Sequence, residues 1–409
     1  MTTKVTDRIT FRHGGTSANR IVLAPMQTWS GLDKGFISEA TLEYYAARSE
    51  TAGLLIVEDN YVSELGGPSR TPQADQQQLG FYSEAHMEGA KKIAEALKKH
   101  GNKAILQLHH AGREANYLSK LGKTAVAPSA MDFPFLDYPV RELTEDEVEM
   151  IVNDFGLAAK RAISCGYDGV EIHGANHYLL QQFFSAYSNH RHDKWGGSLE
   201  NRMRFPLEVT RAVFESIRNI APEGFIVGYR LSPEEVHGSI TGYDYLDSQK
   251  LVSKLCSEFP LDYIHISLAQ YNATPRNSTK TYAELYKEVM DESTKLIIVG
   301  NILNESIAED AIKNADLIAI GRATLIDPEF GKKISEGRGD EIIEKISPEQ
   351  VRTSHLTPGL INVFSDKNMQ PSLPGAESIY QLHTGASLDK SIIKDGTGAA
   401  YNIAGDKLV

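Results

Sequence analysis

Cysteine is scarce in this chain, whose 409 residues include only Cys165 and Cys256. Two thiols are too few to ligate a cysteine-bound iron–sulfur cluster, and so low a content is typical of proteins in a reducing compartment. The first residues, MTTKVTDRITF, contain no apolar segment of the kind found in secretory signals. We therefore expect a cytoplasmic protein.

Long runs of a single residue class are also missing. No window approaches the roughly 18 consecutive apolar residues that a membrane-spanning helix needs, which argues against a membrane partner. The net charge of −12 is spread along the sequence without a block of lysine and arginine, so nucleic acid is not an expected partner. The composition, 41% hydrophobic and 23% charged, is that of an ordinary globular protein. The expected partner is therefore a small-molecule substrate, and the question of a homo-oligomer is left open.

Eight short β-branched runs alternate with longer amphipathic segments. The runs lie at residues 20–25, 54–58, 103–108, 168–173, 225–232, 262–267, 295–300 and 316–321, with helical patterns between them such as 82–99, 144–165, 201–219 and 304–314. Their near-continuous apolar content indicates strands that are buried on both faces, as in a parallel sheet. The pattern predicts an α/β fold of the (β/α)8 TIM-barrel class, with a doubly wound open sheet as the alternative.

The connections after the strands differ greatly in length. Three of them, at 59–81, 109–143 and 174–200, are long, and we expect functional loops there because barrel active sites gather at that face. Beyond about residue 340 the alternation fades into a tail that contains proline, glycine and serine. We predict a barrel domain over residues 1–340 and a C-terminal extension over 341–409 that packs on the barrel or is partly flexible.

Polar side chains stand at the predicted strand ends, where a barrel has its mouth. They are Glu58, Gln107, His173, Arg230, Ser267, Asn301 and Arg322. The absence of lysine from this set argues against a Schiff-base aldolase. A metal-dependent hydrolase stays open as a minor alternative, because several histidines are near these ends, namely His109, His110, His173, His177 and His265. We predict no metal site.

The last two predicted strands each turn into a helix through glycine, in the segments IIVGNI and IAIGRA. Backbone amides at such turns approach a phosphate closely, and barrels frequently bind phosphate after these two strands. Arg322 can add a charge-assisted hydrogen bond to the phosphate. One glycine alone is usually a requirement of the turn. The pair formed by Gly300 and Gly321 favours a phosphate site.

Several sequence blocks, read in order, resemble the old yellow enzyme family of FMN-dependent oxidoreductases from about residue 5 to residue 340. The blocks are NRIVLAPM at 19–26, QLHHAGR at 107–113, APSA at 127–130, EIHGANHYLLQQFFS at 171–185, SNHRHDKWGGSLENRMRF at 188–205, and GNI and AIGRA near the end. The resemblance implies FMN in the barrel mouth and NADH or NADPH as reductant. No second nucleotide-binding unit is visible, so we expect the nicotinamide and the acceptor to use one pocket in turn.

The resemblance also implies roles for individual residues. The flavin contacts that it implies are Gly300, Asn301, Gly321 and Arg322 for the phosphate, Gln107 and Arg230 for the pyrimidine side of the ring, and Pro25, Met26 and Gln27 along the ring. For Arg230 the alternative is a structural ion pair. His173 and Asn176 match the pair that hydrogen-bonds a substrate carbonyl, and Tyr178 matches the proton donor. A phenol with an ordinary pKa of about 10 is protonated at neutral pH and has a proton to give.

Three positions depart from the family pattern. Gln27 stands where threonine or cysteine is usual, Trp29 stands in the substrate pocket where tyrosine is frequent, and Asp59 stands where a small residue is common. An ionised Asp59 beside the flavin would lower its potential and a protonated one would donate a hydrogen bond, whereas an Asp59 that points into solvent would do neither. In the tail, the segment around Thr397 loosely resembles a site of covalent FMN attachment, but an ordinary flexible terminus is favoured.

The function that the resemblance implies is hydride transfer from NAD(P)H by way of FMN to the activated C=C bond of an α,β-unsaturated carbonyl compound, with Tyr178 as proton donor. Two alternatives remain at this stage. The first is an FMN-dependent dehydrogenase, demethylase or NADH oxidase without ene-reductase activity, and Gln27, Trp29 and Asp59 motivate it. The second is a flavin redox sensor without turnover.

Overall fold

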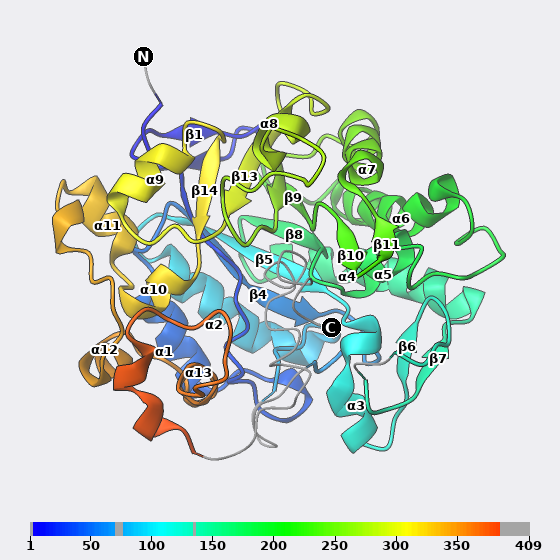
Figure 1. The fold of residues 1–409 in the computed structure, drawn as a ribbon, viewed down its shortest axis with the longest axis horizontal. Coiled ribbons are helices and arrows are strands. Elements are labelled where there is room, and N and C mark those ends of the chain that lie inside the picture. Colours follow the sequence, from blue (N-terminus) through cyan, green and yellow to red (C-terminus); the bar gives the residue numbers. More distant parts are fainter. Residues whose placement is uncertain (1–2, 70–76, 134–135, 385–409) are drawn as a thin grey trace.

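Eight parallel strands form a closed barrel at the centre of the molecule (Figure 1). The computed structural model describes residues 3–69, 77–133 and 136–384. In their order around the barrel the strands are β12 (Tyr263–Ile266), β13 (Lys295–Val299), β14 (Leu317–Ile320), β3 (Ile21–Leu23), β4 (Leu54–Tyr61), β5 (Lys103–His109), β8 (Gly169–Gly174) and β9 (Ile226–Leu231). Pairing of β9 with β12 closes the ring. The predicted barrel is confirmed, and the open sheet is wrong.

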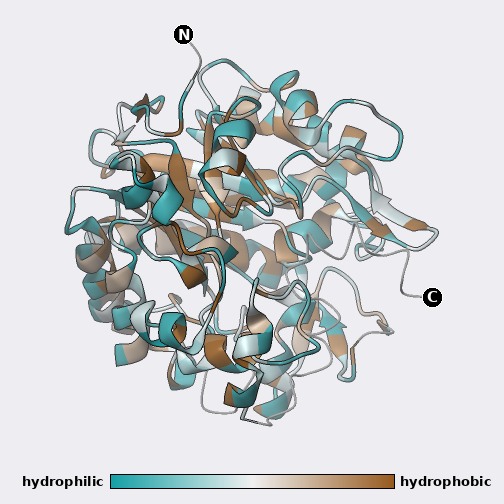
Figure 2. Ribbon diagram, turned by 60° about the vertical axis from the view of Figure 1, so that its left-hand side comes forward, coloured by the Kyte–Doolittle hydropathy of each residue, from teal (hydrophilic) through white to brown (hydrophobic). Residues whose placement is uncertain are grey.

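Helices surround the barrel on its outside. They include α1 (Glu39–Ala47), α2 (Met87–Lys98), α4 (Glu145–Ser164), α6 (Leu199–Ile217), α7 (Tyr245–Glu258), α8 (Tyr282–Lys287), α9 (Glu305–Ala311) and α10 (Arg322–Ile326). Side-chain oxygens at the N-caps, such as those of Ser38, Thr144 and Asp244, accept hydrogen bonds from the first turns of their helices. Hydrophobic residues concentrate on the strands and on the inward faces of the helices (Figure 2). None of the helices described is long and apolar enough to cross a membrane.

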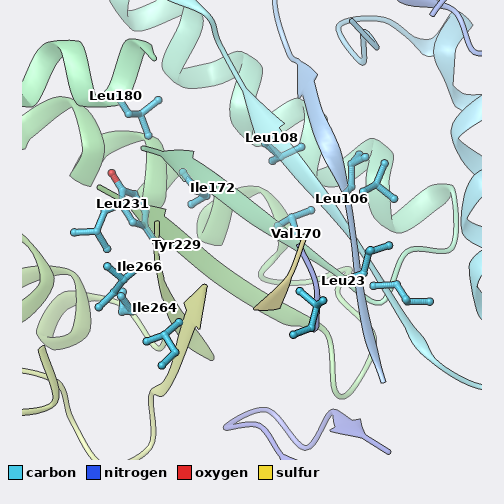
Figure 3. Close-up of a cluster of buried hydrophobic side chains, with 14 of the residues drawn as sticks. Leu23, Leu106, Leu108, Val170, Ile172, Leu180, Tyr229, Leu231, Ile264 and Ile266 are labelled. Atoms are coloured by element: carbon cyan, nitrogen blue, oxygen red, sulfur yellow. The ribbon is translucent and has the colours of Figure 1, made fainter. Parts of the chain in front are cut away.

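The pleat of the strands separates two cores. Outward side chains such as Leu106, Ile172 and Leu231 pack against the helices (Figure 3). Inward side chains fill the lower part of the barrel. The N-terminal hairpin, which contains β1 (Ile9–Thr10) and β2 (Thr16–Ser17), contributes Ile9 and Phe11 to this inner core. Because successive side chains on a strand point to opposite faces, the same register directs later residues of these strands toward the barrel mouth.

Strand β4 departs from this regular register. Its pairing with β5 shifts between Val57 and Asn60, and the irregularity turns Glu58 away from the mouth. The Glu58 carboxylate instead accepts hydrogen bonds from the backbone and hydroxyl of Thr28 (2.9 and 2.6 Å) and from the hydroxyl of Tyr45 (3.1 Å). The prediction that Glu58 faces the mouth is therefore wrong, and Asp59 takes that place.

The long connections carry secondary structure of their own. The loop after β5 contains α3 (Asn116–Lys120), β6 (Ala125–Ala127) and β7 (Val140–Glu142), and the loop after β8 contains α5 (Leu179–Phe184). The strand pair of β10 (Glu235–His237) and β11 (Ile240–Tyr243) follows β9. These elements hold the loops in defined positions around the barrel mouth.

The segment beyond the last barrel strand continues with α11 (Phe330–Ser335), α12 (Pro348–Thr353) and α13 (Pro358–Phe364) and returns to the barrel beside α1 and α10 (Figure 1). The buried guanidinium of Arg48 joins these parts by donating to the backbone oxygens of Ser354 and Thr324 (3.0 and 3.1 Å). The hydroxyl of Thr357 donates to the backbone oxygen of Thr28 (2.5 Å). The tail segment around Thr397 lies outside the described residues.

Candidate active site at the carboxyl end of the barrel

A cavity of about 430 Å³ opens at the carboxyl ends of the barrel strands. All the site residues predicted from the sequence line it: Pro25, Met26, Gln27, Trp29, Asp59, Gln107, His173, Asn176, Tyr178, Arg230, Gly300, Asn301, Gly321 and Arg322. Its size is in the range of small-molecule and cofactor sites, and its lining mixes apolar side chains with a few polar groups. The cavity therefore brings together residues that lie up to about 300 positions apart in the chain.

The floor of the cavity is a network of polar groups inside the barrel. The side-chain amide of Gln107 donates to Glu171 (2.5 Å), and Nδ1 of His265 lies 2.9 Å from the same carboxylate. Burial would raise the pKa of Glu171, but His265, Arg230 and Gln107 outweigh it and hold the pKa below its usual value. Glu171 thus places a fixed negative charge beneath Gln107 and Arg230.

Arg230 lies above this floor and is 8% exposed. Its Nη2 donates to the hydroxyl of Ser267 (3.2 Å), whereas its Nε has no hydrogen-bond partner although it is buried. Within the described part of the chain, no carboxylate oxygen lies within 4 Å of this guanidinium. The geometry therefore does not support the structural ion pair, and it leaves Arg230 with donors for an anionic or polar ligand.

His173, Asn176 and Tyr178 meet at one side of the cavity. The rings of His173 and Tyr178 are in edge contact with their centroids 5.2 Å apart. Burial, together with the charges of Arg230 and other neighbours, holds the pKa of His173 well below its usual value, so the imidazole is neutral. Its buried Nδ1 has no hydrogen-bond partner. The amide of Asn176 lies against the hydroxyl of Ser267, to which its nitrogen donates (3.2 Å).

Another part of the cavity wall combines two glycine turns with an arginine. Gly300 has a φ of 137°, and a side chain there would collide with the backbone of Gln270 at 2.7 Å. Gly321 caps α10, which begins at Arg322. The guanidinium of Arg322 donates to two neutral oxygens, those of Ser372 and Asn301 (3.2 and 3.1 Å). Its positive charge thus lies beside open backbone at the turns after β13 and β14.

Strained backbone is concentrated around the cavity. Six non-glycine residues in the described part of the chain have a left-handed φ, and Trp29, Asn176 and Asn301 among them line the cavity. Asparagine tolerates this conformation, but for tryptophan it is unusual. Such outliers persist where the surrounding structure over-determines them, as at binding sites.

The family model for NADH:flavin oxidoreductases and NADH oxidases matches residues 9–341. The chain belongs to this family. It is 39% identical to a probable NADH-dependent flavin oxidoreductase of Bacillus subtilis over 85% of this chain and 92% of that protein. It is also 36% identical to an NADH:fumarate oxidoreductase of Klebsiella pneumoniae over 83% of this chain, but it spans only 36% of that longer protein. An old yellow enzyme homologue from Zymomonas mobilis superimposes with a TM-score of 0.71 at 26% identity, over 87% of this chain and 99% of that one.

The protein is thus an NAD(P)H-dependent flavin oxidoreductase of the old yellow enzyme type, with FMN as cofactor. The residues of the cavity fit this cofactor. Arg230 has an unpartnered buried nitrogen above the floor, and Arg322 supplies a cation beside the two glycine turns. We expect Arg322 and the turns to hold the phosphate, and Gln107 and Arg230 to hold the pyrimidine side of the ring.

Asp59 is buried at the cavity wall and does not point into solvent. Its Oδ2 accepts hydrogen bonds from the amides of Gln27 (2.9 Å) and Gln78 (2.7 Å), and Nε2 of His109 lies 3.5 Å away. Burial raises the pKa of Asp59 to about 7, although Gln27, Arg230 and Gln78 act in the opposite direction. Asp59 therefore changes its charge near neutral pH.

This titration leads to a prediction for the bound FMN. Above about pH 7 the ionised Asp59 disfavours negative charge on the flavin, so Asp59→Asn should raise the midpoint potential there. Below about pH 6 the carboxyl is mostly protonated, and the variant should differ little from the wild type. Spectroelectrochemical titration across this range checks the prediction. Equal potentials at high pH would show that Asp59 does not tune the flavin.

Sequence reasoning missed a part of the cavity wall that the C-terminal segment supplies. These lining residues are Leu360, Phe364, Met369 and Pro371. Gly359 allows the C-terminal segment to approach the loop that carries Trp29, because a side chain at Gly359 would lie 2.3 Å from the backbone oxygen of Trp29. The only local signal is the start of a helix at Thr357 and Pro358, and nothing in it indicates where the helix packs.

The five histidines that motivated the alternative of a metal-dependent hydrolase do not come together at one site. Of the five, only His173 lines the cavity. His265 contacts Glu171, His109 lies near Asp59, and His177 lies 3.6 Å from the carboxylate of Glu235. In the described ranges, one group could hold a metal ion, formed by His177, Glu235 and His237. Its carboxylate already accepts hydrogen bonds from Ser185 and Gln181 (2.8 and 2.7 Å).

Proposed function

We propose that this flavin oxidoreductase reduces the activated C=C bond of an α,β-unsaturated carbonyl compound. The observation that carries the proposal is the joint placement of a neutral histidine with an unpartnered buried nitrogen, an amide and a phenol at one side of the cavity. A neutral imidazole and an amide can both donate hydrogen bonds. Two such donors and one proton donor are what carbonyl activation followed by protonation requires.

His173 and Asn176 bind the carbonyl oxygen in this proposal. Their hydrogen bonds withdraw electron density from the conjugated C=C bond, so that its β-carbon becomes electrophilic. FMN, when bound, supplies the hydride that it has received from NAD(P)H. His173 is held neutral by burial and by Arg230, so it stabilises the developing negative charge through a hydrogen bond and does not give up a proton itself.

Tyr178 completes the reaction by protonating the α-carbon. Its phenol lies 6% exposed at the cavity wall, and its ring is in edge contact with His109 (4.2 Å between centroids) as well as with His173. These contacts hold the ring in one position. Apolar side chains from the C-terminal segment, among them Leu360 and Phe364, also line the cavity and favour an acceptor with an apolar body.

Steady-state kinetics with cyclohexenone as acceptor test the proposed function. We expect turnover, and we expect parallel lines in double-reciprocal plots at varied NAD(P)H and enone, because both substrates use one cavity in turn. Intersecting lines would contradict the shared cavity. Consumption of NAD(P)H with oxygen or quinones but not with any enone would show that the protein is an oxidase or another kind of dehydrogenase.

A further inference from the structure

Four side chains form a closed ring of hydrogen bonds at the cavity wall, where Gln27 and Asp59 line the cavity and Ser69 and Gln78 lie behind them. The amide nitrogen of Gln27 donates to Asp59 (2.9 Å) and to the hydroxyl of Ser69 (3.0 Å). Ser69 in turn donates to the side-chain oxygen of Gln78 (3.2 Å), and the amide nitrogen of Gln78 donates to Asp59 (2.7 Å). All four residues are at least nine-tenths buried. The ring joins the strand-one loop to the loop after β4.

The ring fixes which way the amide of Gln27 faces. Above about pH 7, where Asp59 is ionised, its carboxylate only accepts hydrogen bonds. The hydroxyl of Ser69 uses its one proton toward Gln78, so it also accepts from Gln27. If the amide of Gln27 turned over, its oxygen would face these two acceptors, and both hydrogen bonds would be lost in a buried place. The nitrogen of Gln27 therefore stays on the side of Asp59.

That same nitrogen also lies 3.2 Å from the hydroxyl oxygen of Tyr178. Its two hydrogens face three acceptors, so one N–H is shared between the phenol oxygen and a member of the ring. The phenol is an acceptor in this contact, so its own proton points in another direction. Tyr178 and Gln27 both line the cavity, whereas Ser69 and Gln78 do not. Ser69 and Gln78, which lie behind the wall, thus act through Gln27 on the direction of a hydroxyl that lines the cavity.

We propose that Gln27, held by Asp59, Ser69 and Gln78, is the positioning residue for the proton donor Tyr178. The inference rests on the proposed reduction of a C=C bond. In the proton step, the O–H bond of Tyr178 breaks, a C–H bond forms at the α-carbon, and the electron pair stays on the phenol oxygen. The N–H of Gln27 then stabilises this oxygen until it regains a proton from solvent.

A double-mutant cycle tests whether Gln27 acts through Tyr178. The protein is reduced with dithionite and mixed anaerobically with cyclohexenone or with menadione, which needs no protonation at carbon. Gln27→Met should slow the enone reaction about tenfold more than it slows the menadione reaction. In a Tyr178→Phe background the same change should have no further effect on the enone reaction, because its target is gone.

Two variants separate positioning from a general loss of packing. Gln78→Leu lies outside the cavity and should slow the enone reaction selectively, as Gln27→Met does. Gln249→Leu is the matched control, since its amide nitrogen also donates a hydrogen bond, to Leu285 (2.6 Å), but lies away from the cavity. It should change neither reaction. Additive losses from Gln27→Met and Tyr178→Phe, or equal slowing of both acceptors, would overturn the inference.

A second readout does not depend on turnover. In apoprotein labelled with [¹⁵N]glutamine, Tyr178→Phe should shift the side-chain amide signals of Gln27, assigned with Gln27→Met. Unchanged signals would show that the hydrogen bond to Tyr178 does not exist and would overturn the inference. A wild-type protein that reduces menadione but no enone would instead refute the proposed function, so the two failures are distinguishable.

Discussion

Replacing Arg230 by methionine is expected to weaken FMN binding and to stabilise the protein without its cofactor. Burial lowers the pKa of Arg230 more than Glu171 and Asp59 raise it, so the guanidinium charge costs folding free energy. In the complex we expect its donors to contact the flavin, so losing charge-assisted bonds of about 1.5–3 kcal/mol should weaken affinity by roughly 10- to 100-fold. Fluorescence titration of the apoprotein with FMN measures the affinity, and calorimetry measures the unfolding midpoint.

A second buried arginine provides the control for this prediction. Arg191 forms an ion pair with Asp193 (2.6 Å) and donates to the backbone oxygens of Pro128 and Leu143 (3.0 and 2.6 Å). Arg191→Met should therefore lower the unfolding midpoint and leave the affinity for FMN unchanged. If Arg230→Met also destabilised the apoprotein and bound FMN normally, Arg230 would be a structural residue and the orientation of the flavin would need revision.

Replacing Tyr178 by phenylalanine is expected to slow reduction of the C=C bond by about 100- to 10,000-fold, the usual contribution of a general acid. The ring and its edge contacts with His109 and His173 remain in this variant, so FMN binding should not change. Stopped-flow reoxidation of the reduced protein by cyclohexenone measures the step directly.

The other half of the catalytic cycle serves as the internal control. Hydride transfer from NAD(P)H needs no proton donor, so reduction of Tyr178→Phe by NAD(P)H should keep its wild-type rate. A variant that reduced the enone at a normal rate would show that the proton comes from another group or from solvent. A variant slowed equally in both halves would indicate a disturbed cavity.

The barrel was predictable from the sequence because burial on both faces leaves a strong pattern in parallel strands. The alternation of side chains along a strand also predicts that residues such as His173 and Arg230 face the barrel mouth. The same rule failed at Glu58, since one irregularity in the pairing of β4 with β5 exchanges the faces that Glu58 and Asp59 occupy. Nothing in the local residues indicates such a shift, because it depends on both strands together.

The chemistry of the site was harder to predict from the sequence than the fold. Residue types and spacing left His173 open as a metal ligand, and the resemblance alone suggested its role beside Asn176 and Tyr178. The contribution of Leu360 could not be predicted, because it depends on a long-range contact between α13 and the loop that carries Trp29. The contact between Gln27 and Tyr178 could not be predicted for the same reason, since the two residues lie 151 positions apart in the sequence.

Isotope labelling of the product tests the central claim most directly. With NADH deuterated at C4 as reductant and cyclohexenone as acceptor in ordinary water, we predict cyclohexanone that carries deuterium at the β-carbon and ordinary hydrogen at the α-carbon. With unlabelled NADH in deuterated water, the label should appear at the α-carbon. Consumption of NADH without labelled cyclohexanone in either experiment would contradict the account.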